Sequence, residues 1–372
     1  MTQTAITRYP AIDLLRGITV CFMIIVNTGG SGAEPYALLQ HAEWHGFTPT
    51  DLVFPTFLFV VGNALAFTMP KLQAMEDKQA IWKILKRTAL IFGLGYLMYW
   101  FPFVRFDESG GWTWKHISET RILGVLQRIA LCYGISALLL RSLNVRSIWI
   151  TGLLILIGYW ALMAWGGEYT IENNLARQID RLLLGDAHLY HGDDIAFDPE
   201  GLLSTLPSLI NVWAGYLAAE HIRRNGDRYK VVADLMIAAM VMLFVAYLWD
   251  RLFPVNKKLW TSSFSLLTGG LSMALLALLI FLTEIHRYKV GAGFFGAFGR
   301  NPLFIYLLSE LLAILMWAIP AGNRSVYEYV NDMLFQSILP GANGSLLFAV
   351  TFMFICWIAG RILDRKRIYI RV

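Results

Sequence analysis

Two histidines lie one helical turn apart in a segment rich in hydrogen-bonding side chains. His41 and His45 belong to the stretch Tyr36-Ala-Leu-Leu-Gln-His-Ala-Glu-Trp-His-Gly46. A short helix would place both imidazoles on one face. A neutral imidazole is the side chain best suited to move a proton or accept an acyl group near pH 7. His41 is therefore a candidate acid–base or acyl-accepting residue, and an interfacial histidine without a chemical role is the alternative.

A metal site is the other chemistry that this histidine pair allows, because two histidines one turn apart can ligate zinc. The order of residues differs from His-Glu-x-x-His, and no third ligand is evident. The three cysteines, Cys21, Cys132 and Cys356, each lie inside an apolar run and have no metal-binding spacing. We therefore expect no metal.

Further polar residues lie inside long apolar runs, where ionisable groups are costly and by default face a bundle interior or a cavity. Their positions along helices that rise about 1.5 Å per residue predict two clusters at opposite faces of a membrane. The inner cluster consists of Asp13, Arg16, Arg128 and Arg300. The outer cluster consists of Asn27, His41, His45, Asp51 and Arg121, with Glu310 near the middle of the membrane.

Purely structural roles remain open for these residues. Asp13 and Arg16 have the spacing of an intrahelical ion pair. Asp51 could be only a helix cap in Thr48-Pro49-Thr50-Asp51, Arg121 and Glu310 only partners within the bundle, and Arg300-Asn301 only a topology anchor and cap before Pro302.

The elements that must position these residues are helices in lipid. Of the 372 residues, 57% are hydrophobic and only 15% are charged, whereas soluble domains carry roughly 25% charged residues. Runs of roughly 18 or more apolar residues predict transmembrane helices. We expect an all-α helical bundle with ten spans at about 12–30, 51–70, 81–102, 120–140, 147–166, 204–222, 231–253, 260–283, 300–319 and 345–363.

The basic residues predict the orientation of these spans. With a cytoplasmic N-terminus, the inner segments hold more than twice as many Lys and Arg residues as the outer ones, which is the positive-inside pattern. Both termini are then cytoplasmic, and residues 1–372 form one transmembrane domain with an extracytoplasmic loop at about 167–203. The net charge of +5 comes without a basic, aromatic-interleaved stripe, so we expect no nucleic-acid partner.

Several motifs together resemble one family. They are Asp13-Leu-Leu-Arg-Gly17, Val26-Asn27, the block from His41 to Pro55, Gly124-Val-Leu-Gln-Arg128, Phe197-Asp-Pro-Glu-Gly-Leu-Leu-Ser-Thr-Leu-Pro207, Leu259-Trp-Thr261 and Gly299-Arg-Asn-Pro-Leu303. The chain resembles, over nearly its whole length, the transmembrane acetyltransferases of the heparan-alpha-glucosaminide N-acetyltransferase family and their bacterial relatives. The block from His41 to Pro55 is the most specific part.

The resemblance implies acetyl-CoA as donor and the amine of a terminal glucosamine as acceptor. The catalytic histidine of the family matches His41, and its asparagine and aspartate match Asn27 and Asp51. The chain departs from the animal enzymes at His45, where they have Asn, so the acceptor is less well determined than the reaction. The resemblance also implies a multi-pass protein of a bacterial inner membrane, and it leaves a homo-oligomer open.

From these expectations follows a mechanism. CoA is cytoplasmic, so Arg16, Arg128, Arg300 and Asn301 would hold its phosphates at the inner face, with Arg300 at a helix N-terminus. The pantetheine arm would reach through the bundle to Asn27 and His41, where Asp51 orients the imidazole and Asn27 hydrogen-bonds the thioester oxygen. On the acceptor side we place His45, Arg121, Glu310 and Trp260, with Trp112 and Trp114 as further stacking residues or part of an interfacial belt.

The sequence leaves two routes and three other functions open. His41 could form an acetyl-imidazole, or it could take a proton from the amine during direct transfer. The competing functions are an acyltransferase that acts on a polysaccharide hydroxyl, a transporter for a sugar or peptidoglycan fragment, and a scaffold protein, which would leave the buried polar residues without a purpose.

Overall fold

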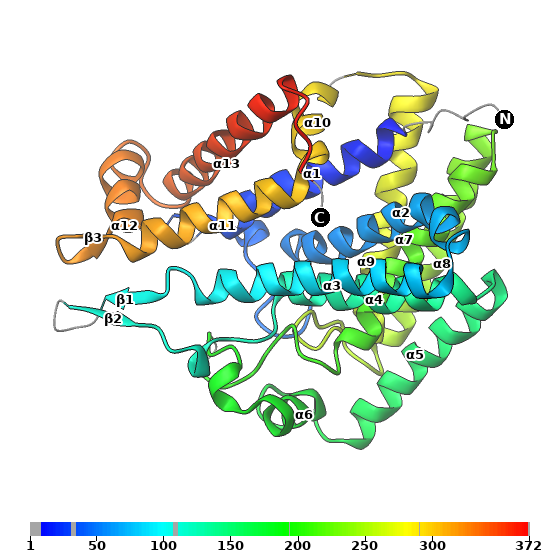
Figure 1. Ribbon diagram of the computed structural model, residues 1–372, viewed down its shortest axis with the longest axis horizontal. Helices are drawn as coiled ribbons and strands as arrows, with labels where there is room; N and C mark the ends of the chain where they lie inside the picture. Colours follow the sequence, from blue (N-terminus) through cyan, green and yellow to red (C-terminus); the bar gives the residue numbers. More distant parts are fainter. Residues whose placement is uncertain (1–8, 31–34, 107–110, 193, 290, 371–372) are drawn as a thin grey trace.

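The structure is a computed structural model that describes residues 9–30, 35–106, 111–192, 194–289 and 291–370. Long helices dominate the described chain (Figure 1). They are α1 (Pro10–Asn27), α2 (Val53–Gln73), α3 (Asp77–Trp100), α4 (Val125–Ser142), α5 (Val145–Trp165), α7 (Thr205–Arg224), α8 (Arg228–Asp250), α9 (Ser262–Ile280), α11 (Pro302–Ala318) and α13 (Ala342–Arg365). Each of the ten apolar runs that the sequence predicted as a span has formed one of these helices.

Shorter elements connect the long helices. The helical ones are η1 (Ala37–Leu39), η2 (Pro49–Leu52), η3 (Ile117–Glu119), α6 (Leu175–Leu184), η4 (Asp186–His188), η5 (Phe281–Ile285), α10 (Ala292–Arg300), α12 (Val326–Val330) and η6 (Asn331–Gln336). Two small antiparallel hairpins pair β1 (Val104–Phe106) with β2 (Trp112–Trp114), and β3 (Pro320–Ala321) with β4 (Arg324–Ser325). Both hairpins and α12 lie at one end of the bundle (Figure 1).

The number of membrane spans is smaller than ten by length and composition. Within the described residues, seven helices are long and apolar enough to cross a membrane: α1, η2 with α2, α4, α5, α8, α9 with η5, and α13. An eighth is obtained when α10 and α11, which meet at an angle of 82°, are taken as one bent span. The other two long helices, α3 and α7, are not among these candidate spans, so the prediction of ten spans is not confirmed.

Helix packing brings the two halves of the chain together beside the N-terminal helix. A Cβ on Gly17 of α1 would lie 2.0 Å from the carbonyl oxygen of Phe295, and a Cβ on Gly299 of α10 would lie 2.3 Å from the carbonyl oxygen of Asp13. Real Cβ atoms do not come so close, so only glycine permits this approach of α1 and α10. Because of this packing Arg16 and Arg300, the neighbours of these glycines, line the same cavity.

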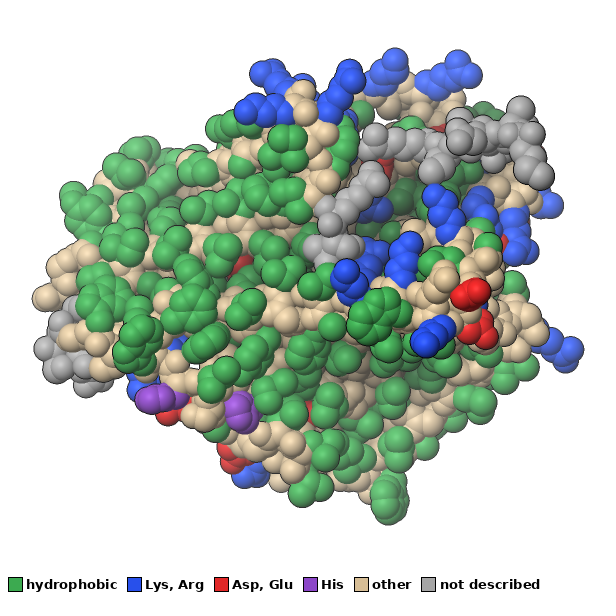
Figure 2. All heavy atoms as spheres, in the orientation of Figure 1, with side chains coloured by type: hydrophobic (Ala, Val, Ile, Leu, Met, Phe, Trp, Pro, Cys, Tyr) green, Lys and Arg blue, Asp and Glu red, His purple; other side chains and the backbone are tan. Residues whose placement is uncertain are grey.

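The charged surface is uneven. On the face shown in Figure 2, Lys and Arg side chains gather along the upper and right-hand margins, over the helix ends that lie away from β1 and β2. The start of α1, with Asp13 and Arg16, and the C-terminal residues Tyr369 and Ile370 line one common cavity at this end. Both ends of the described chain therefore lie on the same side of the bundle.

Candidate functional site

A cavity of about 610 Å³ opens between α1, α2, α3, α4 and the α10–α11 bend. Its wall is apolar along most of its length, with Phe57, Val60, Val61, Ile91, Leu126 and Leu303 among its lining residues. Arginines enter it from three elements: Arg16 from α1, Arg87 from α3, and Arg300 from the end of α10. The cavity thus combines several fixed positive charges with a long apolar surface.

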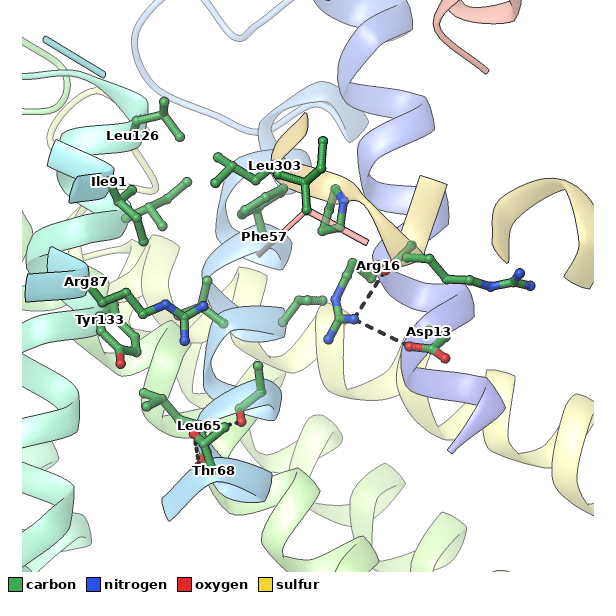
Figure 3. Close-up of a pocket in the computed structure, with 18 of the residues that line it drawn as sticks. Asp13, Arg16, Phe57, Leu65, Thr68, Arg87, Ile91, Leu126, Tyr133 and Leu303 are labelled. Atoms are coloured by element: carbon green, nitrogen blue, oxygen red, sulfur yellow. Dashed lines mark hydrogen bonds and ion pairs between the residues drawn. The ribbon is translucent and has the colours of Figure 1, made fainter. Parts of the chain in front are cut away.

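Arg16 and Arg87 point into the cavity from opposite walls (Figure 3). The Nη1 atom of Arg16 donates to the Asp13 carboxylate at 3.4 Å and to the carbonyl of Gly299 at 3.3 Å. The guanidinium of Arg87 stacks over the ring of Tyr133, 4.6 Å from its centroid. Its Nε is buried and has no hydrogen-bond partner among the described residues. A buried donor of this kind is available to bind an anionic ligand.

The bend between α10 and α11 carries the other predicted inner residues. Arg300 pairs with Asp364 of α13. Asn301 is fully buried, and its side chain accepts from the N–H of Ile370 at 2.9 Å and donates to the carbonyl of Ile368 at 3.0 Å. Asn301 therefore fixes the C-terminal segment against the cavity, while Pro302 begins α11 at the cavity wall.

Arg128 does not join this inner cluster. Its side chain is fully buried; Nη2 donates to the carbonyl of Gly201 at 3.0 Å and to the Ser204 hydroxyl. Its guanidinium lies 4.9 Å from the ring centroid of Trp260. The predicted grouping with Arg16 and Arg300 is therefore corrected: neighbouring residues of α4 line the cavity, but this arginine faces the segment that precedes α7.

Trp260 is a core residue and not an exposed stacking platform. It is 1% exposed, its Nε1 donates to Asn211 at 3.1 Å, and Phe54 packs edge-on against it. Since Arg128 occupies one ring face, a sugar has no access to this indole in the described structure. By contrast, Trp112 and Trp114 on β2 are 54% and 74% exposed.

The predicted pair of His41 and Asp51 is present. Oδ1 of Asp51 lies 2.7 Å from Nδ1 of His41, and the carboxylate is fully buried while the imidazole is 46% exposed. The other carboxylate oxygen accepts the backbone N–H groups of Ala42 at 3.2 Å and Thr48 at 3.0 Å. Asp51 thus caps η2, as the sequence predicted, and the same carboxylate holds the histidine.

A lysine that was not among the predicted site residues also lies at this centre. Lys257 lies between α8 and α9, and its Nζ is 2.9 Å from Nδ1 and 3.0 Å from Nε2 of His41, and 3.7 Å from Oδ1 of Asp51. Burial lowers the pKa of Lys257, although the charges of Asp51 and Glu200 oppose this shift. The loop is tied to the histidine segment by a hydrogen bond from the N–H of Gly46 to the carbonyl of Val255, at 2.8 Å.

Arg121 forms a second buried charge cluster. Its guanidinium donates to Asp198 at 2.6 and 2.9 Å and to Glu200 at 2.5 Å, and it stacks over the ring of Tyr190. Burial opposes the charge of Arg121, but the two carboxylates raise its pKa above the usual value. Burial also disfavours ionisation of Glu200, yet Arg121, Arg128 and Lys257 together lower its pKa. Glu200 thus pairs with Arg121, and its charge also acts on Lys257.

Asn27 lies with Glu310, not against the histidine. The Nδ2 atom of Asn27 donates to Oε1 of Glu310 at 3.2 Å, which joins the end of α1 to the middle of α11. The charge of Glu310 acts on Tyr99, whose hydroxyl receives a hydrogen bond of 3.4 Å from Arg121. No described contact joins Asn27 to His41.

His45 lines a second, more open cavity of about 430 Å³. The other lining residues are Glu43, Trp44, Tyr169, Thr170, Ile171, Glu172 and Lys258. Burial lowers the pKa of His45, and Asp250 opposes that shift. Trp44 is fixed by a hydrogen bond from Nε1 to the carbonyl of Tyr169 at 2.7 Å. Because Glu43, Trp44 and His45 closely follow His41 in sequence, this cavity adjoins the histidine centre.

The arrangement of groups around His41 is suited to acyl transfer. A carboxylate, an imidazole and an ammonium converge at one place, which is the set of groups needed to move protons and stabilise a developing oxyanion. Lys257 and Arg87 were missed because both lie in basic pairs, Lys257-Lys258 and Lys86-Arg87, that resemble ordinary topology signals.

Comparison with known proteins gives the same family twice. Residues 8–245 match the family model described as heparan-alpha-glucosaminide N-acetyltransferase, catalytic. Heparan-alpha-glucosaminide N-acetyltransferase of Homo sapiens is 27% identical in an alignment that covers 82% of this chain and 53% of the human protein. The Mus musculus protein of the same name is 26% identical, over 83% of this chain and 54% of its own length. The chain spans about half the length of these relatives.

Proposed function

This chain belongs to the heparan-alpha-glucosaminide N-acetyltransferase catalytic family, and we propose that it transfers acetyl from acetyl-CoA to the amine of a glucosamine-type sugar. The single observation that carries the proposal is the hydrogen bond of 2.7 Å between His41 and the buried Asp51. Because an ionised carboxylate only accepts, it holds the proton on Nδ1 and leaves the lone pair of Nε2 for chemistry.

The arginine-lined cavity suits the donor. CoA combines phosphates with a long, uncharged pantetheine arm, and the cavity combines Arg16, Arg87 and Arg300 with an apolar wall. The first turn of α11, at Pro302 and Leu303, borders the same space and offers helix N-terminal N–H groups to an anion. The buried Nε of Arg87, unpaired among the described residues, supports an anionic ligand at this position.

The acetyl group would travel along α11 from the cavity to the histidine. Leu303 lines the cavity, and Glu310 lies two turns further along the same helix, roughly 10 Å away. Beyond it, the charge of Glu310 acts on Tyr99, Arg121 donates to Tyr99 and to Glu200, and the charge of Glu200 acts on Lys257. His41 is not among the residues that line the cavity, so the proposal requires the thioester to pass beyond its apolar end, along these groups.

We assign the arginine end to the cytoplasm and the His41 end to the opposite side. The concentration of Lys and Arg at the former end supports this orientation (Figure 2). Acetyl-CoA is a cytoplasmic metabolite, so the geometry amounts to a transfer across the membrane. A bacterial inner membrane and a single transmembrane domain remain our expectations.

At the histidine the reaction has two balanced routes. In the direct route Nε2 takes a proton from the sugar amine, the amine nitrogen bonds to the thioester carbon, the C–S bond breaks and the thiolate recovers the proton. In the covalent route Nε2 bonds to the thioester carbon, the C–S bond breaks, and the thiolate takes the proton that the acylated imidazolium releases; the amine then bonds to the acetyl carbon, the bond to Nε2 breaks, and the imidazole recovers a proton from the amine. Asp51 orients the ring in both routes.

The second cavity is the proposed acceptor site. It offers the aromatic ring of Trp44 for a sugar face and the carboxylates of Glu43 and Glu172 for the positive charge of an amino sugar. His45 lines this cavity, which is consistent with the acceptor role that the sequence suggested. The position of Arg121 is also consistent with that role, because its partner Glu200 acts on Lys257. We no longer propose that Trp260 binds the acceptor. Its ring packs against the guanidinium of Arg128 in the core.

The test of the function is release of CoA thiol by the purified protein from acetyl-CoA, with and without glucosamine. Thiol release that depends on glucosamine and yields N-acetylglucosamine supports the proposal. Acetylation of polysaccharide hydroxyls in preference to amines would favour an O-acyltransferase. Sugar flux across vesicles without acetyl-CoA would favour a transporter.

A further inference from the structure

The ammonium of Lys257 is almost equally close to both nitrogens of the His41 imidazole. Its Nζ is 2.9 Å from Nδ1 and 3.0 Å from Nε2. A donor aligned with one lone pair would be much closer to one nitrogen than to the other. Nζ is therefore not aligned with the lone pair of Nε2, which stays available to an incoming substrate.

Two carboxylates retain this ammonium at the centre. Oδ1 of Asp51 lies 3.7 Å from Nζ, and the charge of Glu200 also acts on it. The side chain of Lys257 is 18% exposed, so the ammonium is largely removed from water, where its hydrogen bonds to a developing negative charge are strengthened. Burial lowers the pKa of Lys257, which makes its N–H groups stronger donors than those of a free lysine.

We propose that Lys257 is a catalytic residue that donates a hydrogen bond to the acetyl oxygen as negative charge develops on it. The inference rests on the proposed function, because it concerns the same reaction. The geometric reason is that the thioester carbon must come to Nε2, or to an amine bound at Nε2, and Nζ already lies 3.0 Å from that atom.

The step is the same in both routes. The nucleophile bonds to the carbonyl carbon, the C=O electron pair moves to oxygen, and an N–H of Lys257 donates to that oxyanion without transferring its proton. When the oxygen pair returns, the C–S bond breaks and the thiolate takes the proton that His41 or the amine has released. Asn27 was expected to bind the oxyanion, but in the structure its amide donates to Glu310.

The experiment compares Lys257→Met and Lys257→Arg with the wild-type full chain in detergent. Removal of one oxyanion donor typically lowers kcat by about 10² to 10³-fold. We expect that loss in Lys257→Met, with an unchanged Kd for acetyl-CoA, and recovery of at least about tenfold of it in Lys257→Arg. The matched control is Lys83→Met, an exposed lysine of α3, which should retain wild-type kcat.

A pH profile separates this role from a merely structural one. Only the protonated lysine brings a positive charge to the oxyanion and is a strong donor, so the wild-type kcat should fall as pH rises through the pKa of Lys257, and Lys257→Arg should move this fall to higher pH. The inference is overturned if Lys257→Met keeps kcat within about threefold of wild type, if it loses only acetyl-CoA affinity, or if the arginine variant leaves the alkaline limb in place. A wild-type protein that acetylates no acceptor would instead overturn the proposed function.

Discussion

The carboxylate of Asp51 lies 2.7 Å from Nδ1 of His41 while its other oxygen caps the first turn of η2 through the N–H of Thr48. One buried side chain therefore fixes both the start of a membrane helix and the orientation of an exposed imidazole. The local folding of this segment is inseparable from the chemistry proposed for it.

Replacement of His41 by Gln removes the proposed base or nucleophile. We expect kcat to fall by about 10² to 10⁴-fold, because glutamine can neither take the amine proton nor carry the acetyl group. Thiol release and calorimetric binding of acetyl-CoA measure the two functions separately. Wild-type turnover in a folded His41→Gln protein would exclude His41 as the catalytic residue.

Replacement of Asp51 by Asn tests the orientation of the imidazole. The amide no longer holds the proton on Nδ1, so we expect kcat to fall by at least about 100-fold. The control is Asp227→Asn, since Asp227 also caps a helix, α8, by accepting from the N–H of Tyr229 at 3.0 Å. Because asparagine caps a helix about as well as aspartate, Asp227→Asn should change both stability and kcat little; an equally small effect of Asp51→Asn on kcat would reduce Asp51 to a cap.

Replacement of Arg87 by Met tests the donor site. The loss of one charge-assisted hydrogen bond to a phosphate should weaken acetyl-CoA binding by roughly 10- to 100-fold, with little change in kcat at saturating donor. Arg146→Met, at an exposed position at the start of α5, is the matched control. Unchanged acetyl-CoA affinity in Arg87→Met would remove Arg87 from the phosphate site.

Asp180 of α6 predicts a pH dependence of stability. It is fully buried, its Oδ2 has no partner among the described residues, and burial raises its pKa to about 7. The folded state thus binds a proton more tightly than the unfolded state, whose pKa is about 3.9. The stabilisation is complete below about pH 4 and is lost, at up to about 1.4 kcal/mol per pH unit, as pH rises to about 7.

The comparison of wild type with Asp180→Asn measures this effect. Asparagine retains the acceptor for the N–H of Leu202, which Asp180 receives at 2.9 Å, but it does not titrate. The Tm of Asp180→Asn relative to wild type should therefore rise between about pH 5 and about pH 8. A difference in Tm that is the same at both pH values would contradict the raised pKa.

The helices could be predicted from sequence because each long apolar run has few alternatives in lipid. The run near 120–140 formed α4 at Val125–Ser142, and the run near 300–319 formed α11 at Pro302–Ala318. The apolar runs alone did not predict how many of these helices cross the membrane. Helix α3 carries charged residues such as Lys83 and Arg87, and whether these face water, lipid or a cavity depends on the neighbouring helices.

The candidate site was predictable where its residues are close in sequence. His41 and Asp51 lie within one short segment, so motif and capping logic found the pair. Arg128 was misassigned because depth along a helix says nothing about which neighbour it faces, and its partners Gly201 and Ser204 lie more than 70 residues away. Lys257, still more distant in sequence from His41, was missed for the same reason.

The central claim is that a thioester held at the arginine end meets His41 at the opposite side of the membrane. Its direct test uses proteoliposomes of known orientation, with labelled acetyl-CoA on the side of Arg300 and glucosamine on the side of His41. We predict labelled N-acetylglucosamine in the His41 compartment while CoA remains in the other, and none with His41→Gln. Product formed only when both substrates share one compartment would contradict the account.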